Sequence, residues 1–336
     1  MVDFRRMNTS PSWWQAITTV PRLDAAQWTA LSSPVRWLLA IRSSVLFMTL
    51  MSSALGGLLA WRDGVFTPLL WWLCLLGLLL AHATNNLLND LTDSRRGVDK
   101  GNYFRTQYGV HPLEDGLLSP KSFYVYIALT AAAALLVGAA IVVMRGGLTL
   151  PLMLAGSFFV LFYTWPLKHY GLGEPAVLLV WGPLMVGGTY YVCSGAWSND
   201  AALLGLLYGI GPTTVLFGKH IDKLELDQAK GVHTLPVILG ESLSRRCTQG
   251  LLLVQYVICA ALVASGREHW LLGIVFLAIP KLMPTLRQLQ RPKPKAKPER
   301  YPAKIWPLWF SAGAFAHTRY FTSLFVIALF LAVWVA

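Results

Sequence analysis

The sequence predicts an all-α integral membrane protein, in which nine transmembrane helices surround a central cavity and cytoplasmic loops or helices cap it. Of the 336 residues, 55% are hydrophobic and 13% are charged, whereas soluble domains carry about 25% charged residues. Nine apolar segments are long enough, or nearly so, to cross a hydrocarbon core of about 30 Å. They are residues 37–61, 67–90, 122–144, 148–166, 174–195, 201–218, 249–265, 270–286 and 319–336.

The net charge of +12 follows the expected topology and does not call for a nucleic-acid partner. Lys and Arg collect before the first segment and in the connections after the second, fourth, sixth and eighth segments. The opposite connections keep Arg62, Arg145 and Arg267. Because cytoplasmic loops are enriched in Lys and Arg, the N-terminus and the basic connections are expected in the cytoplasm. The protein is then a multi-pass protein of the cell (inner) membrane, in contact with its lipids.

The domain organisation follows from these segments. Residues 1–35 are expected to form a cytoplasmic arm, and residues 36–336 the nine-helix transmembrane domain. Arg42 lies about one turn inside the first apolar segment. It either reaches back to the lipid headgroups or faces an anionic ligand, and the sequence leaves both interpretations open.

A polar cluster follows the second apolar segment. Its carboxylates and carboxamides are spaced so that a helix presents several of them on one face. Carboxylates at the mouth of an apolar helix are costly to desolvate, and a hard cation usually compensates for them. A second acidic cluster ends the sixth segment, so the two clusters predict one shared metal site. The candidate ligands are Asn86, Asn89, Asp90 and Asp93 in the first cluster and Asp222, Glu225 and Asp227 in the second.

Three cytoplasmic connections have distinct compositions. Residues 90–121 are long for a helix–helix connection and are expected, together with 219–248, to cap the site. Residues 287–304 form a linker rich in Lys, Arg and Pro, which suits contact with anionic headgroups. Between them, the short loop after the fourth segment contains Lys168 as its one unambiguous cation.

Carboxylates and basic side chains in one site indicate a metal together with a diphosphate. Mg²⁺ commonly binds through one or two carboxylates and through substrate phosphates, and Lys and Arg suit phosphate oxygens. The candidate diphosphate ligands are Arg42, Arg95, Arg96, Lys100, Lys168, Lys219, Lys223 and Lys230.

A diphosphate on a long apolar tail would place its head at the cytoplasmic rim and its tail between helices. If the tail is allylic, loss of diphosphate gives an isoprenoid cation. Aromatic rings can stabilise this cation or serve in packing, and the candidates are Tyr163, Trp165, Trp181, Tyr190 and Tyr191.

These motifs resemble the UbiA superfamily of intramembrane aromatic prenyltransferases, in matching order over roughly residues 36–240. Asn86 to Asp99 resembles the family's first Asp-rich motif, and 230–240 resembles the end of its second. The interval from Asp93 to Asp99 and the segment 163–191 resemble the branch that makes menaquinone precursors from 1,4-dihydroxy-2-naphthoate. The resemblance implies a nine-helix fold, Mg²⁺, an isoprenoid diphosphate donor and an aromatic acceptor.

The resemblance also implies roles for individual residues. Metal ligation falls to Asn86, Asp90, Asp93, Asp222 and Asp227, and the four Asp residues are the catalytic candidates. Asp99 and Tyr163 are candidates for positioning the loop or the acceptor.

The second motif departs from the family pattern, which opens with Asn and spaces its Asp residues four apart. Lys219 and His220 stand where Asn is expected, and Asp222 and Asp227 are five residues apart. On a regular helix that spacing turns the two carboxylates about 140° away from each other. Either a bulge or a helix end realigns them, or Asp222 pairs with Glu225.

Two other functions remain as alternatives. On the same scaffold, a terpene cyclase would convert a prenyl diphosphate to a cyclic hydrocarbon without an acceptor. An ion-coupled transporter is disfavoured, because its acidic residues are expected near the membrane midplane and these lie at helix ends. The sequence does not determine the donor chain length or the oligomeric state.

Overall fold

The computed structural model describes residues 12–18, 23–101, 110–303 and 305–335. Within these ranges the chain is helical, and its one β-type contact is an isolated parallel bridge between Tyr170 and His233. The predicted all-α class is confirmed. Parts of the predicted arm (1–11 and 19–22) and of the first predicted cap (102–109) lie outside the described residues.

The described residues contain eight helical spans that are long and apolar enough to cross a membrane. The uninterrupted ones are α5 (Pro68–Arg95), α6 (Pro120–Arg145), α10 (Asn199–Asp222), α12 (Leu235–Ala264) and α14 (Phe310–Val335). The composite ones are η2 (Ser43–Val45) with α4 (Phe47–Arg62), α8 (Gly173–Leu179) with η5 (Val180–Gly187) and α9 (Gly188–Ser194), and η6 (Trp270–Ala278) with α13 (Ile279–Leu289). The remaining predicted segment forms the shorter apolar helix α7 (Thr149–Phe162). The chain is therefore a multi-pass membrane protein.

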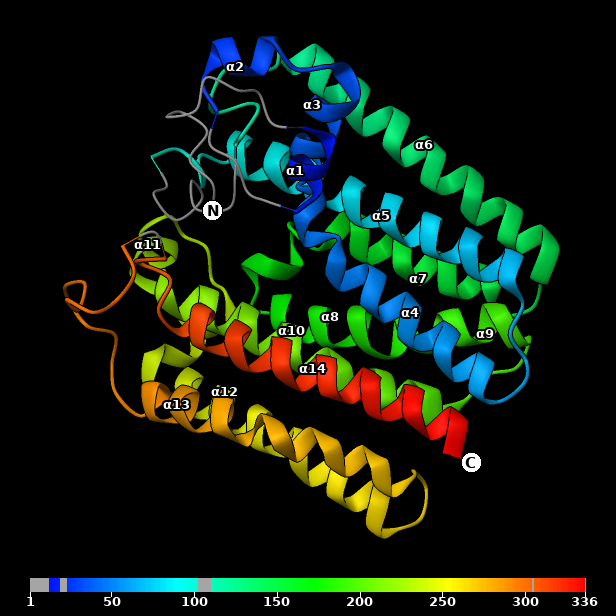
Figure 1. Cartoon of the computed structure of the whole chain (residues 1–336). Coiled ribbons are helices and arrows are strands. Elements are labelled where there is room, and N and C mark those ends of the chain that lie inside the picture. Colours follow the sequence, from blue (N-terminus) through cyan, green and yellow to red (C-terminus); the bar gives the residue numbers. More distant parts are fainter. Residues whose placement is uncertain (1–11, 19–22, 102–109, 304, 336) are drawn as a thin grey trace.

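Helix α10 lies in the middle of the bundle, packed against α8, η5, α12 and α14 (Figure 1). Glycine permits this close approach. A Cβ atom on Gly209 would lie 2.8 Å from the carbonyl oxygen of Leu178, and one on Gly218 would lie 2.6 Å from the backbone nitrogen of Ser311. The second contact brings the C-terminal end of α10 directly against the start of α14.

The N-terminal helices cover one end of the bundle. These are α1 (Trp13–Thr18), α2 (Ala25–Thr29) and α3 (Ser33–Ala40), and the short α11 (Leu224–Ala229) lies at the same end (Figure 1). Trp28 is 1% exposed and packs in one apolar cluster with Leu39 of α3 and with Val110 and Leu117 of the predicted cap. The arm and the cap thus pack together over this end.

Arginine side chains connect helices at the opposite end. The Nη1 atom of Arg62 lies 3.0 Å from a carboxylate oxygen of Glu268, which joins α4 to the loop after α12. Arg145 at the end of α6 donates to the carbonyl oxygens of Val192 and Cys193, and Arg267 pairs with Asp200. Arg62, Arg145 and Arg267, which the sequence predicts on the side opposite the other basic residues, therefore connect neighbouring helices and loops at this end.

We predict that Gly218→Ala destabilises the fold, because the new methyl group would overlap the backbone of Phe310 and Ser311. Overpacking of this kind costs about 1–3 kcal/mol, which exceeds the gain of about 1 kcal/mol from replacing a helical glycine by alanine. The midpoint of thermal unfolding in detergent measures the effect. Gly250→Ala in α12 is the matched control, because its Cβ would meet nothing within 4 Å, and it should leave the midpoint unchanged or raise it.

Candidate functional site

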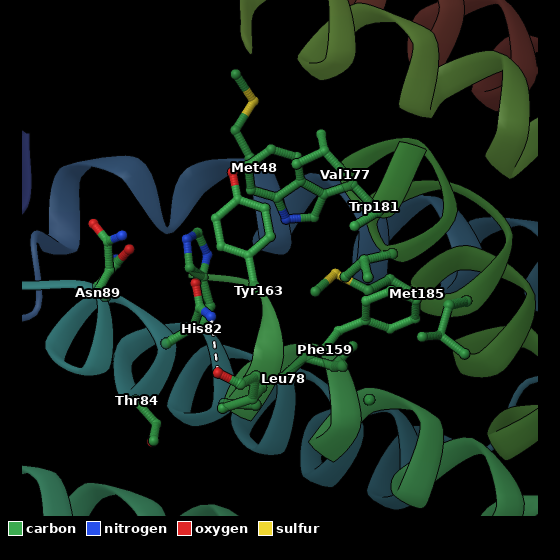
Figure 2. Close-up of a pocket in the computed structure, with 18 of the residues that line it drawn as sticks. Met48, Leu78, His82, Thr84, Asn89, Phe159, Tyr163, Val177, Trp181 and Met185 are labelled. Carbon is green, nitrogen blue, oxygen red and sulfur yellow. Dashed lines mark hydrogen bonds between the residues drawn. The ribbon is translucent and has the colours of Figure 1, made fainter. Parts of the chain in front are cut away.

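A cavity of about 690 Å³ opens between α5, α7, the α8–η5 span and α10. Most of its wall is apolar or aromatic: Figure 2 shows Tyr163, Trp181 and Met48 directed into one space, with Phe159 and Met185 further along. Asn89 lies at the other end of the same space (Figure 2). The cavity therefore has a polar end and an apolar end.

The polar end collects residues from three distant parts of the chain, namely the end of α5, the loop after α7 and the end of α10. The sequence predicted this meeting of two helix ends. The predicted site residues that line the cavity are Arg42, Asn86, Asn89, Asp93, Asp99, Tyr163, Lys168, Lys219 and Lys223.

Asp93 is paired with Lys168. The Nζ atom of Lys168 lies 2.7 and 2.6 Å from the two carboxylate oxygens of Asp93, and both side chains are buried. The side-chain nitrogen of Asn89 donates to the same carboxylate over 3.1 Å. The ion pair joins α5 to the short 3₁₀ turn η4 (Leu167–His169). The predicted placement of Lys168 beside the first acidic cluster is therefore present in the structure.

Asp90 is fully buried and forms an ion pair with Arg42. Arg42, rather than Asp90, is in the wall of the cavity that the described residues form. The arginine also lies 3.3 Å from the side-chain oxygen of Asn89, and its backbone has a φ of 55°, which is unfavourable for a residue with a side chain. Arg42 therefore points into the bundle, and the alternative in which it reaches back to the headgroups is wrong.

His111 of the predicted cap lies beside Asp90 and Asp99, and the sequence did not predict this cluster. Its Nε2 atom lies 3.1 Å from Asp99 and 3.9 Å from Asp90. One ligand atom from each of these three buried residues lies within 4.8 Å of the other two, which suits a metal ion. The one signal in the sequence was the position of His111 in a loop next to the first cluster.

Lys230 holds the neighbouring backbone, because its Nζ atom donates to the carbonyl oxygens of Val98 and Lys100 over 2.5 and 2.7 Å.

Asp222 stabilises the start of α14 and does not face the cavity that the described residues form. Its carboxylate accepts hydrogen bonds from the backbone nitrogens of Trp309, Phe310 and Ser311, at 2.9, 2.9 and 3.1 Å, and from the hydroxyl of Ser311 at 2.8 Å. It therefore caps the N-terminus of α14, where free N–H groups and the helix dipole favour a negative charge. Lys293 of the linker also donates to the Asp222 backbone oxygen. These four donors occupy both carboxylate oxygens, which argues against a metal-ligand role.

The other acidic residues of the second cluster do not join Asp222. Helix α10 ends at Asp222 and α11 begins at Leu224, so the predicted helix end is present. Asp227 instead pairs with Lys223, whose Nζ atom lies 2.8 Å from its Oδ1 atom. Its Oδ2 atom is buried without a hydrogen-bond partner in the described structure. Glu225 is exposed, and no contact with Asp222 is found among the described residues.

A buried dyad beside the second cluster was missed. The Nδ1 atom of His220 lies 2.6 Å from Glu174 at the start of α8, and His220 also lines the cavity. Nearby, the Nδ1 atom of His169 donates to the carbonyl oxygen of Thr164 over 2.9 Å. Burial, with the adjacent charge of Lys168, lowers the pKa of His169, so its imidazole is neutral at pH 7.

Several predicted ligands lie outside the cavity that the described residues form. Arg95 bonds to the hydroxyl of Tyr124, and the guanidinium of Arg96 lies 3.5 Å from the centre of the Trp165 ring. Lys100 is exposed and Lys230 binds backbone oxygens, as described above. Of the aromatic candidates, Tyr163 and Trp181 line the cavity. The hydroxyl groups of the other two tyrosines make contacts elsewhere: Tyr190 donates to Asp63, and Tyr191 accepts from the Leu148 nitrogen.

Comparisons with known proteins give one consistent result. The model of the UbiA prenyltransferase family matches residues 50–308. The chain is 28% identical to the 1,4-dihydroxy-2-naphthoate octaprenyltransferase of Escherichia coli, over 91% of this chain and 98% of that protein. It is 25% identical to the 2-carboxy-1,4-naphthoquinone phytyltransferase of Synechocystis, over 78% and 84% of the two chains. The solved structure of a UbiA homolog from Archaeoglobus fulgidus bound to DMAPP and Mg²⁺ superposes with a TM-score of 0.57 at 16% identity, covering 87% of this chain and 99% of that one.

We predict that Asp222→Ala lowers stability. The substitution leaves the N-terminal nitrogens of α14 without their acceptor in a buried place, at a cost of about 1–3 kcal/mol. Thermal unfolding in detergent measures the loss. Glu225→Ala, which removes an exposed carboxylate three residues away, is the control and should leave the unfolding midpoint unchanged. An unchanged midpoint for Asp222→Ala would contradict the capping role.

Proposed function

The chain belongs to the UbiA prenyltransferase family, and from this premise we propose that it transfers a prenyl group from an isoprenoid diphosphate to an aromatic quinone precursor. The acceptor class we propose is a hydroxylated naphthoic acid. Support for it comes from the similarity to the E. coli octaprenyltransferase, which extends over nearly the whole of both chains.

One observation carries the proposal: a single cavity joins a charged end to a long apolar end. The charged end contains Arg42, Lys168, Lys219 and Lys223, whose side chains suit the oxygens of a diphosphate. The apolar end suits a hydrocarbon tail, and Leu78, Phe159 and Met185 line it (Figure 2). A substrate with an anionic head and an isoprenoid tail matches both ends at once.

The donor atoms at the end of α5 fit a divalent cation, which we propose is Mg²⁺. Asp90 and Asp99, together with His111, bring ligand atoms within 4.8 Å of one another, and Asp93 follows three residues after Asp90 on α5. Arg42 balances the charge of Asp90, and Lys168 balances that of Asp93. The side-chain nitrogen of Asn86 donates a hydrogen bond to the carbonyl oxygen of Ile41, so the side-chain oxygen is the atom that can bind a cation. Such an oxygen-rich, anionic set is what Mg²⁺ prefers. When bound, the cation neutralises charge on the departing diphosphate.

The protein's own residues account for the remaining steps. Lys168 and Arg42 each pair with a carboxylate of α5 and also line the cavity, so both can bind the oxygens of the diphosphate. The apolar wall excludes water from the C1 carbon as the carbon–oxygen bond breaks, and the rings of Tyr163 and Trp181 face the space in which the cation forms (Figure 2). Asp99 and Tyr163 both line the cavity and are proposed to position the acceptor.

We propose that the polar end faces the cytoplasm and that the protein resides in the cell (inner) membrane. Helices α1, α2, α3 and α11 lie at the same end of the bundle as the candidate site (Figure 1). The connections that Arg62, Arg145 and Arg267 join are at the opposite ends of the helices. The positive-inside rule then orients the bundle.

Mass spectrometry of reaction products tests the proposed function. Purified protein is incubated with Mg²⁺, prenyl diphosphates of several lengths and a panel of aromatic acids. A prenylated aromatic product is expected. A cyclic hydrocarbon formed without any acceptor would instead establish a terpene cyclase, and the absence of diphosphate release with every donor would refute the proposal.

We predict that Asp93→Asn lowers the rate of diphosphate release on the order of 100-fold, because it removes a charge from the site where the leaving group is stabilised. The assay measures diphosphate released per protein at saturating acceptor. Asp200→Asn, an exposed carboxylate at the opposite end that pairs with Arg267, is the control and should retain the wild-type rate. A full rate in Asp93→Asn would remove this residue from the site.

Chelation of divalent ions gives a further prediction. EDTA should abolish diphosphate release, and added Mg²⁺ should restore it, because the carboxylates of α5 cannot themselves neutralise the leaving group. The test follows product formation before and after addition of each reagent. Undiminished turnover in EDTA would show that the reaction needs no divalent cation.

A further inference from the structure

The end of α10 presents cations, and not carboxylates, to the cavity. Of the three acidic residues in the second cluster, Asp222 caps α14, Glu225 is exposed and Asp227 is paired with Lys223. The side chains that α10 and its end contribute to the polar part of the cavity wall are Lys219, His220 and Lys223. The two sides of the polar end thus differ in sign: the α5 side is rich in carboxylates and the α10 side in ammonium groups.

The contacts of Lys223 explain why this side is a poor metal site. Its ammonium group lies 2.8 Å from Asp227, and both side chains are buried. A divalent ion on Asp227 would meet this fixed positive charge. Asp222 cannot assist, because four hydrogen bonds hold its carboxylate at the start of α14, and Glu225 is exposed. One carboxylate beside a lysine does not make the oxygen cage that Mg²⁺ requires.

Lys219 and Lys223 are well placed for a different task. Lys219 lies in the last turn of α10, Lys223 directly follows the end of this helix, and both line the cavity. Together with Asp227, which pairs with Lys223, the two lysines leave an excess of positive charge on this side of the cavity. Unlike a bound ion, they are attached to the chain.

We propose that this protein binds its diphosphate with a single divalent cation on the α5 side, and that Lys219 and Lys223 supply the positive charge on the α10 side in place of a second cation. This inference rests on the proposed function and narrows it. The substrate class is unchanged, but the head group is held between a metal and two lysines.

Metal counting tests the inference without relying on turnover. The full-length protein in detergent is titrated with Mn²⁺ in the presence of geranyl thiolodiphosphate, a slowly reacting donor analogue, and bound Mn²⁺ is counted by electron paramagnetic resonance. One analogue-dependent Mn²⁺ per chain is expected. Two would overturn the inference while leaving the proposed function intact, whereas no analogue-dependent Mn²⁺ would overturn the proposed function as well.

Charge reversal at Lys223 makes the test sharper. Lys223→Asp places a carboxylate four residues before Asp227, whose Oδ2 atom has no hydrogen-bond partner in the described structure, and should create a second Mn²⁺ site. Lys281→Asp applies the same charge change on α13, where the lysine lies 4.9 Å from the centre of the Tyr320 ring, and should leave one Mn²⁺.

Neutral variants measure the contribution of each lysine to diphosphate binding. Lys219→Gln and Lys223→Gln should each weaken analogue binding about tenfold, as expected for loss of one charge-assisted hydrogen bond, and should still bind one Mn²⁺. Lys281→Gln is the control. Wild-type affinity in both Lys219→Gln and Lys223→Gln would overturn the inference, because the lysines would then serve only to stabilise the helix end.

Discussion

Two buried ion pairs, Asp93 with Lys168 and Asp90 with Arg42, hold the polar end of the cavity together. Buried charges are costly unless they are paired, so these contacts determine how the elements that carry them meet. One pair fixes the loop after α7 against α5, and the other fixes the junction between α3 and α4. The left-handed backbone of Arg42, at a φ of 55°, shows that its position is determined by this pairing rather than by local preference.

The same pairs connect structure to the proposed chemistry. Arg42 and Lys168 neutralise the carboxylates of Asp90 and Asp93 on α5. A divalent cation would neutralise them equally well, and the two basic side chains would then be available to phosphate oxygens at short range. The site therefore needs no large rearrangement to receive an anionic head group, because the charges that it exchanges are already adjacent. The arm packs against the cap through an apolar cluster that includes Trp28, Leu39 and Val110.

Hydropathy and charge were sufficient to predict the fold. In lipid, each apolar segment must form a helix, because only then are its backbone N–H and C=O groups hydrogen-bonded within the segment. Helical spacing was sufficient for the first cluster, since Asn86, Asn89 and Asp93 share a face that reaches the cavity. It failed for Asp222, because the partners of that carboxylate begin 87 residues later, at the start of another helix. It also missed His111 and Glu174, whose roles depend on which loop folds back onto which helix.

The irregular second motif is where sequence and structure differ most, and its irregularity has a physical consequence. A break between α10 and α11 turns Asp222 toward α14 and leaves Asp227 with Lys223. The basic residues of this segment, rather than its acidic ones, are consequently the groups that reach the cavity. A diphosphate in this cavity would lie between an anionic wall, which requires a bound cation, and a cationic wall, which does not. In the function we propose, that difference in sign would orient the head group and direct the hydrocarbon tail toward Phe159 and Met185.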